Sequence, residues 1–269
     1  MFIKILKYFF LSILGLIILT ALVATPLIIK ARKEGDRMYA KYDNYTRKAL
    51  AENFQLKPYP VKQEYQKVHP WKALKLFKIV IESQEEERLK RVNILEATIL
   101  LFMKMYTLVI LPNYNYNLPM LSVDIISMGG ERVFAIEFID PAQIKDENLE
   151  VHYEKLRAWK PKVEGLEKMK VDMAWAESVV TDFSIHRQTD RSNDELLFET
   201  YKHYLNAYLE MAKNAEPLSP GLSEKVQQGM EWYVDTLLAK GGPAVNVFNF
   251  LLGPEKQKEY VRTVMFGID

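Results

Sequence analysis

The sequence predicts an α+β fold in which an antiparallel sheet is covered by helices. Two observations lead to this prediction. Strand-like runs follow one another from residue 73 to residue 139, and helical periods dominate from residue 148 onward. Strands that come first and helices that come later are typical of such an arrangement.

The N-terminal segment predicts a membrane anchor. Phe9 to Ile29 is free of charged residues and about long enough to span a hydrocarbon core as a helix. The basic residues beside it are Lys4, Lys7, Lys30, Arg32, Lys33 and Arg37. Their distribution favours a single-pass membrane protein with its globular domain on the cytoplasmic side. We therefore expect an anchor over residues 1–33, a polar stalk or linker over residues 34–58 and a globular domain over residues 59–269.

The first half of the globular part predicts a meander of strands. Strand composition marks residues 73–83, 88–98 and 106–111, and Pro112 ends the third run. A hairpin follows, with Met120 to Met128 and Arg132 to Ile139 as its strands. Gly129 and Gly130 can supply the positive φ angles of a two-residue turn. In the second half we expect one further strand over residues 182–187 and an amphipathic helix over residues 222–238.

Asp124 is the unexpected residue of this hairpin. Side chains alternate across a strand, so Asp124 shares one face with Ser122, and a two-residue turn would place Ala135 opposite Asp124 and Glu137 opposite Ser122. Asp is depleted from strands, and apolar surroundings raise the pKa of a carboxyl group. From these residues alone, Asp124 is interpreted as a buried carboxylate that is hydrogen-bonded to the backbone or to a neighbouring basic residue.

The composition excludes several classes of protein. A net charge of +1 gives no basic excess for a nucleic-acid binder. The absence of cysteine excludes disulfides, thiolate nucleophiles and thiolate metal sites, and the four histidines lack the spacing of a metal site. We expect no metal ligands.

Two blocks resemble the ferredoxin-dependent bilin reductase family. The first is LPNYNYNLPMLSVDIISMGG with the apolar strand that follows it, and the second is the C-terminal pattern of Gly253, Tyr260, Met265 and Phe266. The resemblance implies a three-layer α/β/α sandwich with a central antiparallel sheet. It also implies reduction of a linear tetrapyrrole such as biliverdin, with reduced ferredoxin as electron donor, no bound cofactor and Asp124 as proton donor.

The chain departs from the family pattern at several positions. Thr107 stands where well-known members carry histidine or asparagine, residues 241–245 read GGPAV in place of Asn-Asp-Pro-Ala-Arg, and Lys256 replaces a tryptophan. Thr107, Ser122, Glu137 and His186 are the expected substrate-binding residues. Glu137 could act as a second acid or form a surface salt bridge, and His186 could donate a proton or be an ordinary exposed histidine.

These departures leave a second hypothesis open. A protein that kept the pocket but lost part of the proton relay would be a non-catalytic, membrane-tethered tetrapyrrole carrier or sensor. Arg187 or Lys170 could hold a propionate, and the sequence does not distinguish between them.

Overall fold

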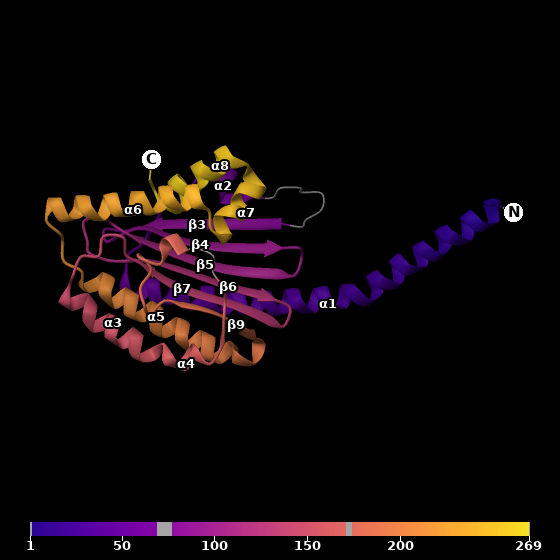
Figure 1. Ribbon diagram of the computed structural model, residues 1–269, viewed down its shortest axis with the longest axis horizontal. Coiled ribbons are helices and arrows are strands. Elements are labelled where there is room, and N and C mark those ends of the chain that lie inside the picture. Colours follow the sequence, from indigo (N-terminus) through magenta and orange to yellow (C-terminus); the bar gives the residue numbers. More distant parts are fainter. Residues whose placement is uncertain (1, 69–76, 171–173, 269) are drawn as a thin grey trace.

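An antiparallel sheet forms the centre of the protein (Figure 1). The computed structural model describes residues 2–68, 77–170 and 174–268. The side chains of residues 2–24, 243 and 244 lie outside this description. The strand order is β1-β3-β4-β5-β6-β7-β9-β8, and β2 also pairs with β3. The strands are β1 (Lys57–Pro58), β2 (Lys67–Val68), β3 (Phe77–Glu85), β4 (Leu89–Ile99), β5 (Met103–Pro112), β6 (Met120–Met128), β7 (Glu131–Ile139), β8 (Glu167–Lys168) and β9 (Ile185–Asp190).

Helices cover both faces of this sheet. The helices are α1 (Phe2–Asn53), α2 (Gln63–Gln66), α3 (Glu147–Trp159), α4 (Pro161–Glu164), α5 (Asp194–Asn214), α6 (Pro220–Lys240), α7 (Pro243–Leu252) and α8 (Pro254–Glu259), followed by a π-helical turn over Tyr260–Met265. One hydrophobic core joins the sheet to α1, α3 and α5, and a second core joins its other face to α2, α6, α7 and the π-helical turn. Figure 1 shows these groups as layers above and below the strands. The predicted α+β sandwich with an antiparallel sheet is confirmed.

The central hairpin has the predicted register. Asp124 of β6 stands opposite Ala135 of β7, and Ser122 stands opposite Glu137. Of the two turn glycines only Gly129 has a positive φ angle, 66°. The predicted strand over residues 73–83 is β3, and residues 73–76 lie outside the described residues. The strand predicted over residues 182–187 lies three residues later, as β9.

Residues 34–58 correct the prediction of a stalk. Most of this segment is the C-terminal part of α1, and it packs against the sheet instead of linking it to another part. The residues of its buried stripe recur every four positions: Met38, Tyr42, Thr46, Leu50 and Phe54. A four-residue repeat puts one narrow face of a helix against a core while charged residues occupy the rest of its surface. The high overall polarity of the segment concealed this stripe.

The structure describes only part of the predicted anchor. The side chains of residues 9–24, most of Phe9–Ile29, lie outside the described residues. Within the described part of the chain, no helix contains a stretch of sufficient length and apolarity to span a bilayer.

The loop between β4 and β5 has an unusual conformation. Leu100 (φ 51°) and Leu101 (φ 71°) both occupy the left-handed region. For a residue with a side chain this conformation costs about 1–2 kcal/mol, which is why glycine or asparagine is usual there. The loop therefore keeps two leucines at a position where they are costly.

Candidate active site

Asp124 lies in a row of side chains that crosses four strands. In register, Thr107 of β5, Asp124 of β6, Ala135 of β7 and His186 of β9 stand side by side. They share the face of the sheet that α6 covers. Thr107 and Ala135 are buried, whereas Asp124 and His186 are partly exposed. Three of the five predicted site residues are thus brought into one row.

The Asp124 carboxyl group is hydrogen-bonded to Thr107. The Thr107 hydroxyl donates to Asp124 Oδ1 at 2.5 Å. Burial raises the pKa of Asp124 to about 6, the Thr107 hydrogen bond opposes this rise, and the negative charge of Glu137 adds to it. Asp124 is therefore a group that exchanges a proton near neutral pH.

The other two predicted residues, Ser122 and Glu137, lie beside this row. Ser122 stands opposite Glu137 in the next row of the same face. His186 Nε2 and Glu137 Oε1 are 2.7 Å apart, and this contact crosses from one row to the next. Both side chains are partly exposed, at 24% and 14%. The face thus carries two hydrogen-bonded pairs, Thr107 with Asp124 and Glu137 with His186.

Tyr233 of α6 is a site neighbour that the sequence analysis missed. Burial raises the pKa of this phenol well above its ordinary value, and the charges of Glu137 and Asp124 raise it further, so the ring lies close to both acids. The Tyr233 ring centroid is 5.6 Å from that of Trp175. In the sequence, Tyr233 is one aromatic residue in an apolar helical stripe, a pattern that more often indicates core than site.

Trp175 adds an unusual polar group to this neighbourhood. Its Nε1 atom is buried and has no hydrogen-bond partner within the described residues. Buried polar groups normally have partners, so an unpaired indole N–H beside Tyr233 is available to a ligand.

The motif residues of the C-terminus have a different role. Tyr260 and Phe266 are buried in the core on this face. The amide of Asn93 donates to the Met265 carbonyl oxygen at 2.8 Å, which holds the chain end against β4. The residues of the C-terminal motif therefore contribute to packing. They take no part in the hydrogen-bonded pairs of Thr107 with Asp124 and Glu137 with His186.

One propionate candidate is excluded from this face. The Arg187 guanidinium is buried on the opposite side of β9, where its Nε donates to the Val163 carbonyl oxygen at 3.0 Å. As for metals, the described residues contain no group of three or more His, Cys, Asp or Glu side chains that could hold an ion.

Comparison with known proteins identifies several relatives. The family described as ferredoxin-dependent bilin reductase matches residues 43–267. A phycoerythrobilin:ferredoxin oxidoreductase of Prochlorococcus marinus subsp. pastoris is 24% identical over 165 residues, which cover 59% of this chain and 64% of that protein. The chain thus spans less than two thirds of that relative. A protein of the same name from Gloeobacter violaceus is 20% identical over 86% of this chain and 96% of its own.

A solved structure has the same fold. Tomato phytochromobilin synthase, crystallised with biliverdin, superimposes with a TM-score of 0.71 over 84% of this chain and 83% of its own, at 15% identity. This likeness concerns the fold alone. The family match, which extends from within α1 almost to the end of the chain, includes the whole sheet and all the candidate site residues. The chain therefore belongs to the ferredoxin-dependent bilin reductase family.

Proposed function

We propose that this protein is an oxidoreductase that reduces a linear tetrapyrrole, biliverdin or a related bilin, with single electrons from reduced ferredoxin and without a bound cofactor. Family membership supports this proposal, as do relatives named phycoerythrobilin:ferredoxin and 15,16-dihydrobiliverdin:ferredoxin oxidoreductase, the latter from Nostoc punctiforme and 23% identical over 61% of this chain. Each electron added to a conjugated bilin is matched by a proton. The protein must therefore supply a positioned acid.

The observation that carries the proposal is the raised pKa of Asp124, about 6, on a partly exposed face of the sheet. An acid with a pKa near the working pH is protonated often enough to donate and recovers its proton readily. We assign Asp124 as the proton donor. Thr107 orients its carboxyl group, while Ser122, Glu137 and His186 contact polar groups of the substrate.

A second candidate function rests on the Thr107 contact. A threonine hydroxyl cannot act as a proton relay near neutral pH, and its hydrogen bond favours the charged form of Asp124. A site with a weakened relay could bind a tetrapyrrole without reducing it. The protein would then be a carrier or a sensor of the pigment.

An anaerobic assay distinguishes the two functions. The full-length chain in detergent is mixed with biliverdin and then with a reducing ferredoxin system while its absorption is followed. Binding followed by a blue shift, as double bonds are saturated, indicates the enzyme, and binding without a shift indicates the carrier. Absence of binding would refute both. Asp124→Asn should bind the pigment and stall its reduction; an unchanged product yield would rule out Asp124 as donor.

Membrane attachment is the second part of the proposal. The charge-free run from Phe9 to Ile29 supports an anchor over residues 1–33, and the exposure of Leu27 (63%) and Ile29 (48%) at its end is consistent with an apolar environment. We propose a single pass with the globular domain on the cytoplasmic side. Reporter fusions at either end of this run test the topology, and a domain on the other side of the membrane would contradict it.

A further inference from the structure

We infer that one end of the globular body docks onto a bilayer that contains anionic phospholipids. This docking end consists of Leu27 and Ile29 of α1, Leu100 of the β4–β5 loop, and Val247 and Phe250 of α7. The inference extends the proposed membrane attachment from α1 to the body of the protein. It relies on the proposed anchor for the orientation of the body.

Exposed apolar side chains gather at this end. Eight large apolar side chains are exposed within the described residues, and five of them form the docking end. Their exposed fractions are 63% for Leu27, 48% for Ile29, 47% for Leu100, 36% for Val247 and 67% for Phe250. A concentration of apolar surface, as opposed to scattered single residues, marks an interaction site.

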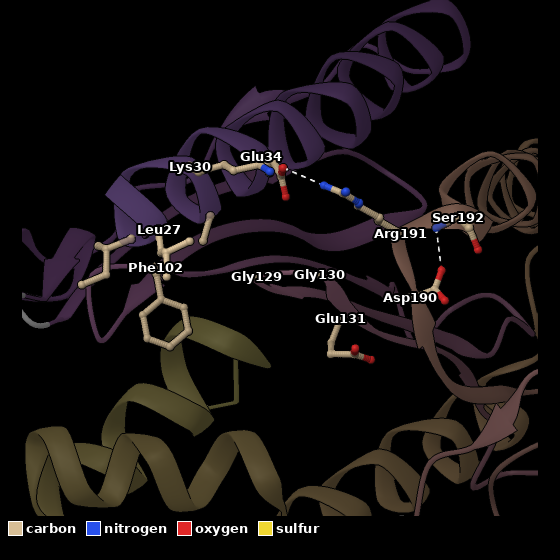
Figure 2. A pocket seen from close by; sticks show the side chains of 12 residues that line it. Leu27, Lys30, Glu34, Phe102, Gly129, Gly130, Glu131, Asp190, Arg191 and Ser192 are labelled. Atoms are coloured by element: carbon tan, nitrogen blue, oxygen red, sulfur yellow. Dashed lines mark hydrogen bonds and ion pairs between the residues drawn. The ribbon is translucent and has the colours of Figure 1, made fainter. Parts of the chain in front are cut away.

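Contacts place these side chains on the same end of the sheet. A pocket of about 840 Å³ is lined by Leu27 and Ile28 of α1 and by Phe102 of the β4–β5 loop, and Figure 2 shows Leu27 beside Phe102. On the other side of this loop, Phe77 pairs with Ile99. The ring of Phe77 lies 6.4 Å from that of Phe250. The docking end therefore runs from α1 through the loop to α7.

The β4–β5 loop lies beside α1 close to the end of the apolar run. Gly35 of α1 packs directly against Lys104, the second residue of β5, so the loop ends two residues before this contact. From Gly35 back to Ile29 the helix rises about 9 Å, at 1.5 Å per residue. Figure 1 shows α1 leaving the body on the side toward which the β4–β5 turn points.

The loop conformation supports the same conclusion. Leu100 and Leu101 both have positive φ angles, in a three-residue turn where glycine or asparagine would be less costly. Strain of this kind persists where function requires particular side chains. A requirement for apolar side chains at the tip of an exposed loop is met by insertion into lipid.

The charges beside the apolar surface specify the kind of lipid. The exposed cations after the run are Lys30, Arg32, Lys33 and Arg37. Two acids of α1 pair with cations of the body: Glu34 with Arg191 at 3.0 Å and Asp36 with Lys104 at 2.8 Å. The four cations of α1 are therefore available to anionic headgroups, while the exposed acids Glu131 and Asp190 lie on the other side of the pocket, on β7 and β9.

The pocket in Figure 2 is not itself a phosphate site. Glu34, Glu131 and Asp190 line it together with Lys30 and Arg191, and these three acids would repel a phosphate group. The apolar rim and the cations of α1, not this pocket, are the parts that meet the bilayer.

The experiment uses the absence of cysteine from the sequence. Full-length Leu100→Cys is labelled with an environment-sensitive nitrobenzoxadiazole dye and reconstituted in phosphatidylcholine–phosphatidylglycerol vesicles whose acyl chains carry nitroxides. The matched control is Leu222→Cys, at an exposed position (39%) at the start of α6. This helix begins near the opposite end of the sheet, where the Leu218 backbone N–H donates to the Asn115 carbonyl oxygen. Thr20→Cys reports on the anchor.

We expect the label at position 100 to emit at shorter wavelength and to be quenched by the nitroxides, with neither effect at position 222. Equal behaviour at positions 100 and 222, with quenching at position 20, would overturn the docking of the body and leave the anchor intact. Quenching at position 100 without quenching at position 20 would support docking and refute the anchor. Quenching at neither position would refute both. Stronger quenching in pure phosphatidylcholine than in the mixed vesicles would overturn the role of anionic lipid.

Discussion

Replacing Asp124 by asparagine should stabilise the protein at neutral pH. The pKa of Asp124 is about 6 in the folded protein and about 3.9 for an ordinary unfolded aspartate. Between these values the folded state binds more protons than the unfolded state, so folding stability falls as the pH rises. The difference of about 2 corresponds to about 3 kcal/mol lost by pH 7, since each whole pKa unit is 1.36 kcal/mol.

Urea unfolding at pH 4 and at pH 7 measures this effect. The gain in unfolding free energy of Asp124→Asn over the unchanged protein should be about 2–3 kcal/mol larger at pH 7 than at pH 4. The control is Ser122→Ala, in which a side chain without a titrating group on the same face of β6 is altered. Its effect should be the same at both pH values. If Asp124→Asn also had the same effect at both, burial would not be raising the pKa of Asp124.

Three further substitutions test other contacts. Thr107→Val removes a hydrogen bond to the Asp124 carboxylate worth about 1.5–3 kcal/mol, so the pKa of Asp124 should rise by about 1–2 in an infrared titration, whereas Thr107→Ser should leave it in place. Gly35→Ala would bring a new Cβ atom to 2.6 Å from Lys104 Cβ. The free energy of unfolding, measured with urea, should therefore fall by about 1–3 kcal/mol. An unchanged unfolding midpoint would contradict this close packing. Leu100→Asn relieves the left-handed strain and should raise the melting temperature through a gain of about 1 kcal/mol, while a lower melting temperature would show that the leucine is needed for folding.

The sequence predicts the hairpin of β6 and β7 well because its information is local. Alternation assigns Asp124 to a face, and a two-residue glycine turn sets the register, so the pairing of Asp124 with Ala135 follows from positions within about twenty residues. The amphipathic helix predicted over residues 222–238, which is α6, is predicted for the same reason. Period and turn chemistry are properties of short segments.

Contacts between distant segments were not predictable in this way. His186 contacts Glu137 only because β9 pairs with β7. The segment between these two strands contains α3 and α4, and no spacing in the sequence predicts their pairing. Tyr233 approaches the acids only through the packing of α6 on the sheet. The wrong prediction of a stalk over residues 34–58 has another cause. A narrow apolar stripe on one face of a helix barely changes the mean polarity of that helix.

The other side chains of β6 offset the free energy that burying Asp124 costs. On the opposite face of β6, Leu121, Val123 and Ile125 are fully buried. Burial of such side chains contributes about 1.5–3 kcal/mol each, which together exceeds the cost of about 3 kcal/mol for the raised pKa of one carboxyl group. Because the two faces of a strand are independent in this respect, Asp124→Asn leaves the packing against α1 and α5 intact. The stability gained in that variant therefore measures what the protein gives up to hold an acid on this face.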